Sequence, residues 1–251
     1  MEIMIYALVS VNEGSGKLEK LLLDLKGISG VALYSVCLNG IAAVVGENKK
    51  SDLISDKANA IEFAGIIEKL SHHFTLLPMR YGSFMESADA IALMLERNYQ
   101  EIEQNLGKVE DKYEFGLKVF CDSEKLKSGI LQKTEAETGT PANAANEVKY
   151  SVFREYVNAK LKAHRLEELM ISYVDSVIIA INTQLTLLQA EHKFKKMASA
   201  SILIDSVFLL DKRKKDELVD VIKKLQSQYP ELDFVLTGPW PPYSFVETTI
   251  K

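Results

Sequence analysis

Cysteine and tryptophan are scarce in this chain of 251 residues, which contains two cysteines and one tryptophan. Cys37 and Cys121 lie far apart, so the sequence predicts neither a disulfide framework nor a zinc motif, and a reducing cytoplasm fits. No apolar run reaches the roughly 18 residues that a bilayer span needs. The first residues lack the basic stretch of a secretory signal. We therefore expect no signal peptide and no lipid membrane partner.

Sequence signatures of common enzymes are also missing. The chain has no Walker loop, no GxGxxG, no HExxH and no GxSxG. His72 and His73 adjoin at an expected helix end, whereas His164 and His192 are isolated, so no histidines show the spacing of a metal site. The carboxylates are scattered along helix faces, without a pair marked for acid–base work. We expect no catalytic residues, no metal site and no cofactor.

A strongly basic surface is not expected either. Lysine and arginine number 30 against 35 aspartates and glutamates, which gives a net charge of −5. Proteins that follow nucleic-acid phosphates normally present a basic surface. The short basic runs at 193–196 and 212–215 are interpreted as solvated surface. The sequence predicts no nucleic-acid partner. Its 47% hydrophobic and 26% charged residues indicate a folded protein of one large domain or two ordinary ones.

The first part of the chain alternates between two hydrophobic periods. Apolar residues recur every second position where strands are expected and at i, i+3, i+4 and i+7 where helices are expected. Asn39-Gly40 favours a two-residue hairpin turn. The order is strand, helix, strand, strand, helix, strand, at residues 3–11, 18–25, 31–38, 41–45, 63–70 and 74–79. This is the βαββαβ order of a ferredoxin-like domain, predicted to span residues 1–84.

A second ferredoxin-like domain, 111–251, is predicted beyond a bridging helix at 85–110. Its expected strands are 113–121, 177–188, 202–210 and 232–236, and 189–198 is expected to be a loop. Helices are expected near 124, from about 142 to 172 with a break before it at Gly139-Thr140-Pro141, and around 218–225. The long helix should span roughly 45 Å and protrude. The predicted fold class is α+β with two βαββαβ domains, the second having an enlarged, protruding helical part.

Residues 77–84, which we call the Arg80 segment, follow the last strand of the first domain. Pro78 cannot donate a ladder hydrogen bond, so it marks a strand end or an edge. Gly82 permits a sharp turn, and Tyr81 and Phe84 flank it. Two interpretations of Arg80 stay open. In an enzyme or ligand-binding protein it would clamp a phosphate or carboxylate, and in a structural protein it would tie the joint between domains.

The stretch 238–245, which we call the strap, is stiff and aromatic. It contains the only tryptophan and three of the six prolines. Prolines fix φ and remove donors, so the sequence predicts an extended backbone that docks on the body of the protein. Its aromatic side chains either close the C-terminal core or partly face a protein partner. The candidate interaction residues are Gly238, Pro239, Trp240, Pro241, Pro242, Tyr243 and Phe245.

These two stretches resemble motifs of one family. Leu77-Pro78-Met79-Arg80-Tyr81-Gly82 is similar to LP-x-R-[FY]-G, and the strap is similar to GPWPPYSF, both of the GvpF/GvpL gas vesicle proteins. Residues 201–211 resemble the strand before that family's last helix. Met79 and Leu210 depart from Val-like residues, which are volume-tolerant apolar exchanges. The resemblance covers nearly the whole chain.

The resemblance implies a fold of two α/β domains and a role without enzymatic activity. Family members are minor components needed to build gas vesicles, and they are thought to bind the hydrophobic shell protein GvpA and other accessory gas vesicle proteins. The implied location is the gas vesicle, with the cytoplasm before assembly. Two alternatives remain: a small-ligand-binding or enzymatic α/β protein using Arg80, and an RNA-binding ferredoxin-like module. The acidic balance argues against the second.

Overall fold

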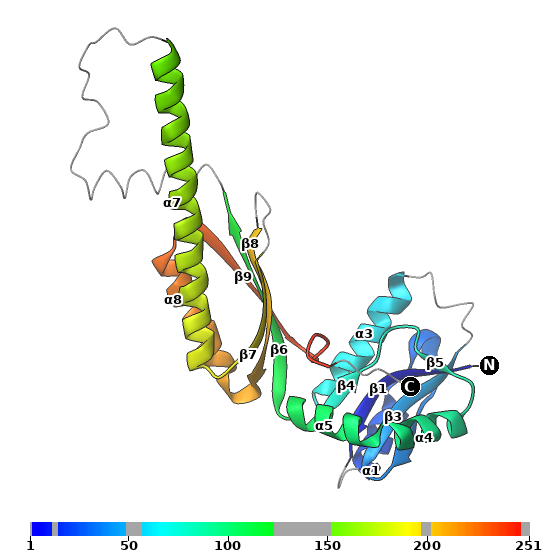
Figure 1. Cartoon of the computed structure of the whole chain (residues 1–251). Coiled ribbons are helices and arrows are strands. Elements are labelled where there is room, and N and C mark those ends of the chain that lie inside the picture. Colours follow the sequence, from blue (N-terminus) through cyan, green and yellow to red (C-terminus); the bar gives the residue numbers. More distant parts are fainter. Residues whose placement is uncertain (1, 12–14, 49–56, 123–151, 197–201, 247–251) are drawn as a thin grey trace. The chain divides into compact units, whose positions relative to one another are not determined.

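The computed structural model describes residues 2–11, 15–48, 57–122, 152–196 and 202–246. Two compact units make up the chain (Figure 1). Unit 1 comprises Met1–Glu114 and Gly238–Lys251, and unit 2 comprises Phe115–Thr237. The bounds of these two units differ from the predicted domain ranges 1–84, 85–110 and 111–251. The chain enters unit 2 along one strand and returns to unit 1 along another.

Unit 1 is built on one antiparallel sheet with the strand order β2-β3-β1-β4, and β5 also pairs with β1. Asn39 and Gly40 have φ values of 45° and 83°, which confirms the expected tight turn between β2 and β3. The elements are β1 (Glu2–Ser10), α1 (Ser15–Asp24), η1 (Ile28–Gly30), β2 (Leu33–Leu38), β3 (Ile41–Asn48), α3 (Lys57–Ser71), β4 (Leu76–Pro78), β5 (Phe84–Met85), α4 (Ala88–Arg97) and α5 (Tyr99–Val109).

The central strand β1 is buried along its length because helices contact both faces of the sheet. One core cluster joins β1 to α1 and α3, while α4 lies against β2 and α5 against β1 and β4. The register shifts between Ile5 and Ala7, so Tyr6 is an extra residue in the strand. Because of this bulge, Tyr6 lies in the same core cluster as Ala7 and Val9. Strict alternation would place Tyr6 on the opposite face of the strand, together with Leu8.

The predicted bridging helix at 85–110 is wrong in one respect, because two helices occupy this stretch. Ser87 caps α4 by accepting a hydrogen bond from the Ala90 N–H at 3.1 Å. Asn98 separates α4 from α5, and its side-chain amide donates to the Met94 carbonyl at 2.8 Å. A local side-chain bond of this kind competes with helix continuation. Both helices belong to unit 1.

Unit 2 is also built on one antiparallel sheet, with the strand order β7-β8-β6-β9. In Figure 1, α7 and α8 lie on one face of this sheet. Phe115 of β6 and Phe208 of β8 stack in the core, with ring centroids 5.9 Å apart. The elements are β6 (Lys112–Cys121), α7 (Val152–Leu187), β7 (Glu191–Lys196), β8 (Ile202–Asp211), η2 (Lys212–Lys214), α8 (Lys215–Gln228) and β9 (Leu232–Trp240).

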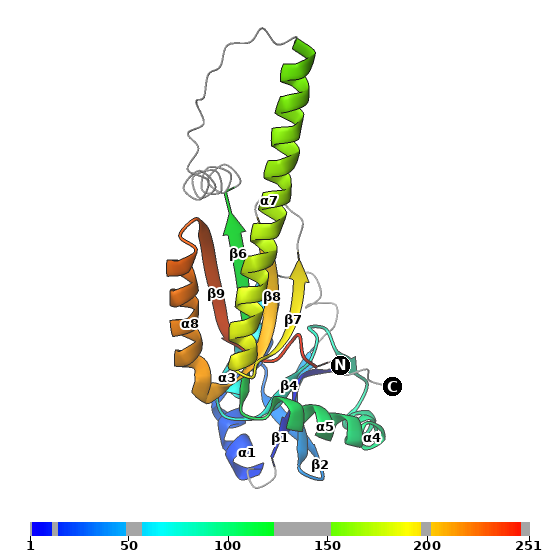
Figure 2. The same cartoon turned by 60° about the vertical axis from the view of Figure 1, so that its left-hand side comes forward.

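Helix α7 corrects two predictions. The expected strand at 177–188 is wrong, since α7 continues to Leu187, and the expected loop at 189–198 contains β7. β-Branched residues favoured a strand, but Val177, Ile181 and Leu185 are buried at helical spacing, so tertiary packing overrides propensity. The 36 residues of α7 span roughly 54 Å, and both views show it extending beyond the strands (Figures 1 and 2). The predicted helix near 124 and the break at 139–141 lie outside the described residues.

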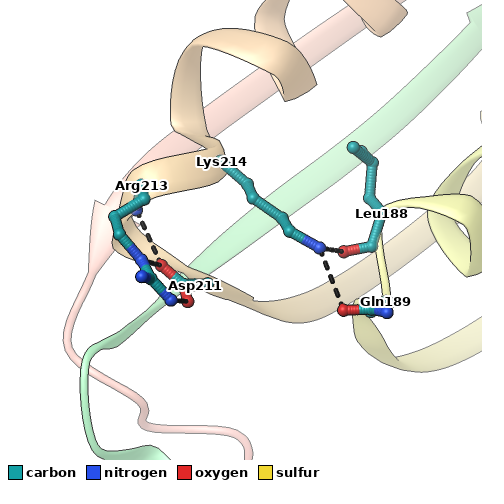
Figure 3. A network of polar contacts seen from close by, with 5 residues as sticks. All are labelled: Leu188, Gln189, Asp211, Arg213 and Lys214. Carbon is teal, nitrogen blue, oxygen red and sulfur yellow. Dashed lines mark hydrogen bonds and ion pairs between the residues drawn. The ribbon is translucent and has the colours of Figure 1, made fainter.

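A polar network joins the end of α7 to the start of α8 (Figure 3). Lys214 Nζ donates to the Leu188 carbonyl at 2.9 Å and to Gln189 Oε1 at 3.1 Å. Asp211 accepts hydrogen bonds from the side chain and backbone N–H of Arg213, which hold the pKa of Asp211 below its ordinary value. Lys214 therefore satisfies a carbonyl at the negative end of a helix dipole.

We expect Lys214→Met to lower the free energy of unfolding by about 1 kcal/mol, because the helix end loses its charged donor while the aliphatic stem is kept. Urea titration measures the change. Lys224→Met is the matched control, since Lys224 is an exposed lysine of α8, and it should stay within about 0.5 kcal/mol of the parent protein. Equal losses in both variants would contradict a specific role for Lys214.

Candidate functional site

The Arg80 segment is a turn inserted between two short strands that pair with the same neighbour. Ala7 of β1 pairs with Pro78, and Met4 pairs with Phe84. Between these pairs, the Ile5 N–H donates to the Ser83 carbonyl at 2.9 Å. Pro78 therefore stands at the end of an edge strand, as its missing donor predicts. At this edge of the sheet, the five residues 79–83 separate β4 from β5.

Local hydrogen bonds hold this turn. The Ser83 N–H and hydroxyl both donate to the Arg80 carbonyl, at 3.1 and 2.8 Å. Gly82 has φ +86°, a conformation that strains other residues. Tyr81 packs edge-on against Phe63, with ring centroids 5.3 Å apart. The segment's conformation thus follows from its own residues and from the core beneath it.

Arg80 itself is exposed at the tip of this turn. Among the residues that the structure describes, its guanidinium has no hydrogen-bond or ion-pair partner. A cavity of about 160 Å³ in unit 1 is lined by Tyr99, Glu103 and Glu110 among others, and Arg80 is not part of its lining. In the same described ranges, no three His, Cys, Asp or Glu side chains are grouped to hold a metal. The proposed joint role of Arg80 stays a prediction.

The strap is attached to unit 1 by a buried carboxylate. Glu114, near the start of β6, is 5% exposed. Its two oxygens accept hydrogen bonds from the Ser244 backbone N–H and hydroxyl, both at 2.7 Å. Such bonds to an ionised acceptor are stronger than neutral ones. Glu114 therefore ties residues 130 positions apart in the sequence.

Apolar contacts complete this attachment. Phe245 is 3% exposed, and Lys108 Nζ lies 5.9 Å from its ring centroid. Pro241 and Pro242 are buried, and their carbonyls accept from the Tyr243 and Phe245 N–H groups in a tight turn. The Gly238–Pro239 peptide bond is cis, and Gly238 has φ +107°. The prediction of an extended strap is thus right only as far as β9, which ends at Trp240.

The strap residues divide into an attached set and an exposed set. Trp240 is 44% exposed and Tyr243 is 43% exposed, whereas the prolines between them are buried. Burial, then the nearby carboxylates Glu68 and Glu114, raise the pKa of Tyr243 to about 12. Its hydroxyl is therefore protonated at neutral pH. The side chains of Trp240 and Tyr243 are therefore partly exposed to solvent, while the bonds from Ser244 to Glu114 hold the nearby backbone in place.

Sequence reasoning missed Glu114 and Ser244 as strap partners. The alternation of residues 113–119 placed Phe115 on the buried face, and Glu114 was left on the opposite one. The structure buries both, because β6 begins in unit 1, where Glu114 bonds to Ser244, and continues into unit 2, where Phe115 packs in the core. The signal that was available is a carboxylate inside an apolar strand, which needs a partner when buried. Nothing in the local pattern identifies Ser244 as that partner.

In the described part of the chain, one helical stretch is long and apolar enough to cross a membrane, which corrects the prediction that no such stretch exists. It is Glu167–Leu187 of α7, of which 17% is buried. Length and composition do not distinguish a bilayer span from a helix that packs one face on a sheet. Here Val177 and Ile181 pack inward and are fully buried.

The two antiparallel sheets with their helices define an α+β protein, and solved proteins share this architecture. The crystal structure of the gas vesicle protein GvpF from Anabaena sp. PCC7120 has a TM-score of 0.77 at 16% identity, with 99% of each chain covered. GvpF from Microcystis aeruginosa gives 0.72 at 16% identity, covering 98% of this chain and 99% of that one. These likenesses establish the fold.

Sequence comparison identifies the family. The gas vesicle synthesis protein GvpL/GvpF family model matches residues 2–247. Gas vesicle protein F of Streptomyces sp. (strain CB03234) is 24% identical over 219 residues, covering 84% of this chain and 87% of that protein. Gas vesicle protein F1 of Halobacterium salinarum is 21% identical, covering 92% and 90%. The chain belongs to the GvpL/GvpF family of gas vesicle synthesis proteins, which implies association with gas vesicles.

Proposed function

We propose that this chain acts in gas vesicle assembly by binding the hydrophobic shell protein GvpA and other accessory gas vesicle proteins, without catalysing a reaction. A shell subunit with apolar surface must be kept from aggregating before it joins a growing wall. A protein that covers this surface provides such protection. The cytoplasm before assembly, and the vesicle afterwards, are the locations that this role requires.

One observation supports the proposal above the others: the exposed aromatic pair of the strap, Trp240 and Tyr243. Tryptophan and tyrosine are enriched among the residues that dominate binding energy at protein interfaces. Each buries a large apolar area, and few of its side-chain rotamers are lost on binding. The Glu114–Ser244 bonds fix the backbone beneath the pair. A surface that is ordered before binding loses less entropy when the partner arrives.

We also propose that each sheet belongs to a ferredoxin-like unit. The strand orders β2-β3-β1-β4 and β7-β8-β6-β9 support this, because in each the first strand lies beside the third and the fourth. The order of the described elements in unit 1 up to β4 fits βαββαβ. In this arrangement the strap leaves the last strand of the second sheet.

The test is capture of purified shell protein by the Trp240→Ala/Tyr243→Ala double variant. We expect at least about a tenfold loss of affinity, since two aromatic contacts of this kind exceed 1.4 kcal/mol together. Leu93→Ala is the matched control, because Leu93 is also 44% exposed but lies on α4, and it should bind normally. Undiminished capture by the folded double variant would remove the strap from the interface.

A further inference from the structure

Helix α7 has two faces of opposite character. Val177, Ile181 and Leu185 are buried. About 100° per residue places Ile179 opposite this buried row and places Ile171 and Leu187 on the two flanks of the helix. The side chains of Ile171, Ile179 and Leu187 are 54%, 65% and 70% exposed. We call the exposed residues between 168 and 187 the outer face of α7. A soluble helix normally presents charged and polar residues on this side.

The hydroxyl groups near this face are directed back into the helix. Ser176 Oγ donates to the Tyr173 carbonyl, Thr183 Oγ1 to the Ile179 carbonyl, and Thr186 Oγ1 to the Asn182 carbonyl, at 2.7, 2.8 and 2.8 Å. These donors are satisfied inside the helix, so they have little need of water or of a polar partner. The outer face is therefore more apolar in effect than its sequence suggests.

A shallow hollow of about 490 Å³ lies on this face. Among the residues that the structure describes, its lining comes from α7 and consists of Glu168, Ile171, Ser172, Asp175, Ser176 and Ile179. The two isoleucines are separated by small serines, which leaves room for side chains of a neighbouring helix to enter. Ridges that enter such depressions are the usual way in which helices pack.

The charge around the hollow has one sign. Between residues 167 and 187 the side chains that are charged at neutral pH are Glu167, Glu168 and Asp175, and the sequence has no lysine or arginine there. The three acidic residues are exposed. Glu168 Oε1 lies 3.4 Å from His164 Nδ1 at i, i+4. The apolar centre of the face is thus edged by carboxylates.

We infer that the outer face of α7 docks an amphipathic helix whose aliphatic stripe is flanked by lysine or arginine. The inference rests on the proposed function only in that the chain works by binding protein. Aliphatic residues of the partner bury Ile171 and Ile179, and its cations face the carboxylates of the hollow. A second copy that docks through the same stretch, residues 167–187, does not fit, because it would bring carboxylates against carboxylates.

The test uses two labelled synthetic helices with the same leucine face, one with lysine and one with glutamate on the polar face. Fluorescence anisotropy of each is measured against the full chain. We expect the lysine peptide to bind and the glutamate peptide not to bind. Glu168→Lys/Asp175→Lys should weaken lysine-peptide binding about tenfold, and Ile171→Ser/Ile179→Ser should weaken it about equally.

Control variants separate this site from general acidity and from the strap. Glu96→Lys/Asp220→Lys changes the net charge equally at exposed positions on α4 and α8, and it should bind the lysine peptide as the parent does. Equal weakening by this control, or unchanged binding by both α7 variants, overturns the inference. Trp240→Ala/Tyr243→Ala should keep peptide binding, so failure of the strap proposal and failure of this one are distinguishable.

A lipid surface is the competing occupant of an apolar helix face. Vesicles of phosphatidylcholine, with and without phosphatidylglycerol, are sedimented with the parent chain and with Ile171→Ser/Ile179→Ser. We expect no co-sedimentation of the parent with either vesicle, since the acidic edge repels anionic lipid. Co-sedimentation that the serine variant loses would assign the face to a lipid surface and overturn the inference.

Discussion

Replacing Glu114 with alanine should release the strap and lower the free energy of unfolding by about 3 kcal/mol. Two hydrogen bonds to a buried carboxylate disappear, and each is worth roughly 1.5–3 kcal/mol. The Ser244 N–H and hydroxyl then lose their acceptor. Urea titration measures the loss, and amide hydrogen exchange at Ser244 should become fast. Shell-protein capture should weaken although Trp240 and Tyr243 are unchanged, because the backbone beneath them is no longer ordered.

Two further variants separate the two bonds. Glu114→Gln keeps one carbonyl oxygen as an acceptor, so about half of the loss should remain. Ser244→Ala removes only the hydroxyl bond, and a double-mutant cycle with Glu114→Ala should give a coupling energy of about 1 kcal/mol. Glu110→Ala, at an exposed residue of the same stretch, should change stability by less than about 0.5 kcal/mol. Additive effects in the cycle would contradict a direct Glu114–Ser244 contact.

Raising the pH from 10 to 12 should destabilise the protein through Tyr6, by about 2 kcal/mol. Tyr6 is fully buried, and its hydroxyl oxygen accepts a hydrogen bond from the Ile28 N–H at 3.1 Å. Burial, opposed by that hydrogen bond and aided by Glu62 and Tyr81, raises the pKa of Tyr6 from 10.0 to about 12. The unfolded chain loses this proton first. The stability is therefore complete below pH 10 and is lost as the pH rises through 12.

Tyr6→Phe should reverse the order of stability across this range. At pH 7 the variant is less stable by about 1 kcal/mol, since the Ile28 N–H loses its acceptor. Phenylalanine does not titrate, so near pH 12 the variant should be the more stable protein by about 1 kcal/mol. Urea titrations at a series of pH values, with tyrosinate absorbance as a second signal, measure the crossing. Parallel stability curves would show that Tyr6 does not contribute to alkaline unfolding.

Local sequence patterns predicted much of unit 1, because the signals for its helices, strands and turns each lie within a few residues. The apolar spacing of α1 and α3 and the Asn39-Gly40 turn are local signals, and the structure has those elements. The bulge at Tyr6 was not predictable in this way, because it depends on the register with β3. In α7, Ile, Val and Thr favoured a strand by propensity, while burial at helical spacing decided the structure.

The candidate residues were chosen for their amino-acid composition, whereas the contacts that these residues make could not be predicted from the sequence. Proline and aromatic residues marked the strap, and Gly82 marked the turn at Arg80. The division of the strap into buried Phe245 and exposed Trp240 and Tyr243 depends on where the chain returns. Its partner Glu114 lies 130 residues earlier. A pairing over that separation leaves no periodic trace in the sequence, so only the folded chain reveals it.

The chain passes from unit 1 into unit 2 after Glu114 and returns to unit 1 after Thr237. This path sets the order in which the two units can be completed during synthesis. Ribosomes release residues 238–245 only after the whole of Phe115–Thr237 has been translated, yet those last residues complete unit 1. In a nascent chain whose synthesis pauses within unit 2, Glu114 therefore lacks its hydrogen-bond partner Ser244. Such an unfinished polypeptide lacks the ordered Trp240 and Tyr243, and we expect it to be unable to take up a shell subunit before its own synthesis is finished.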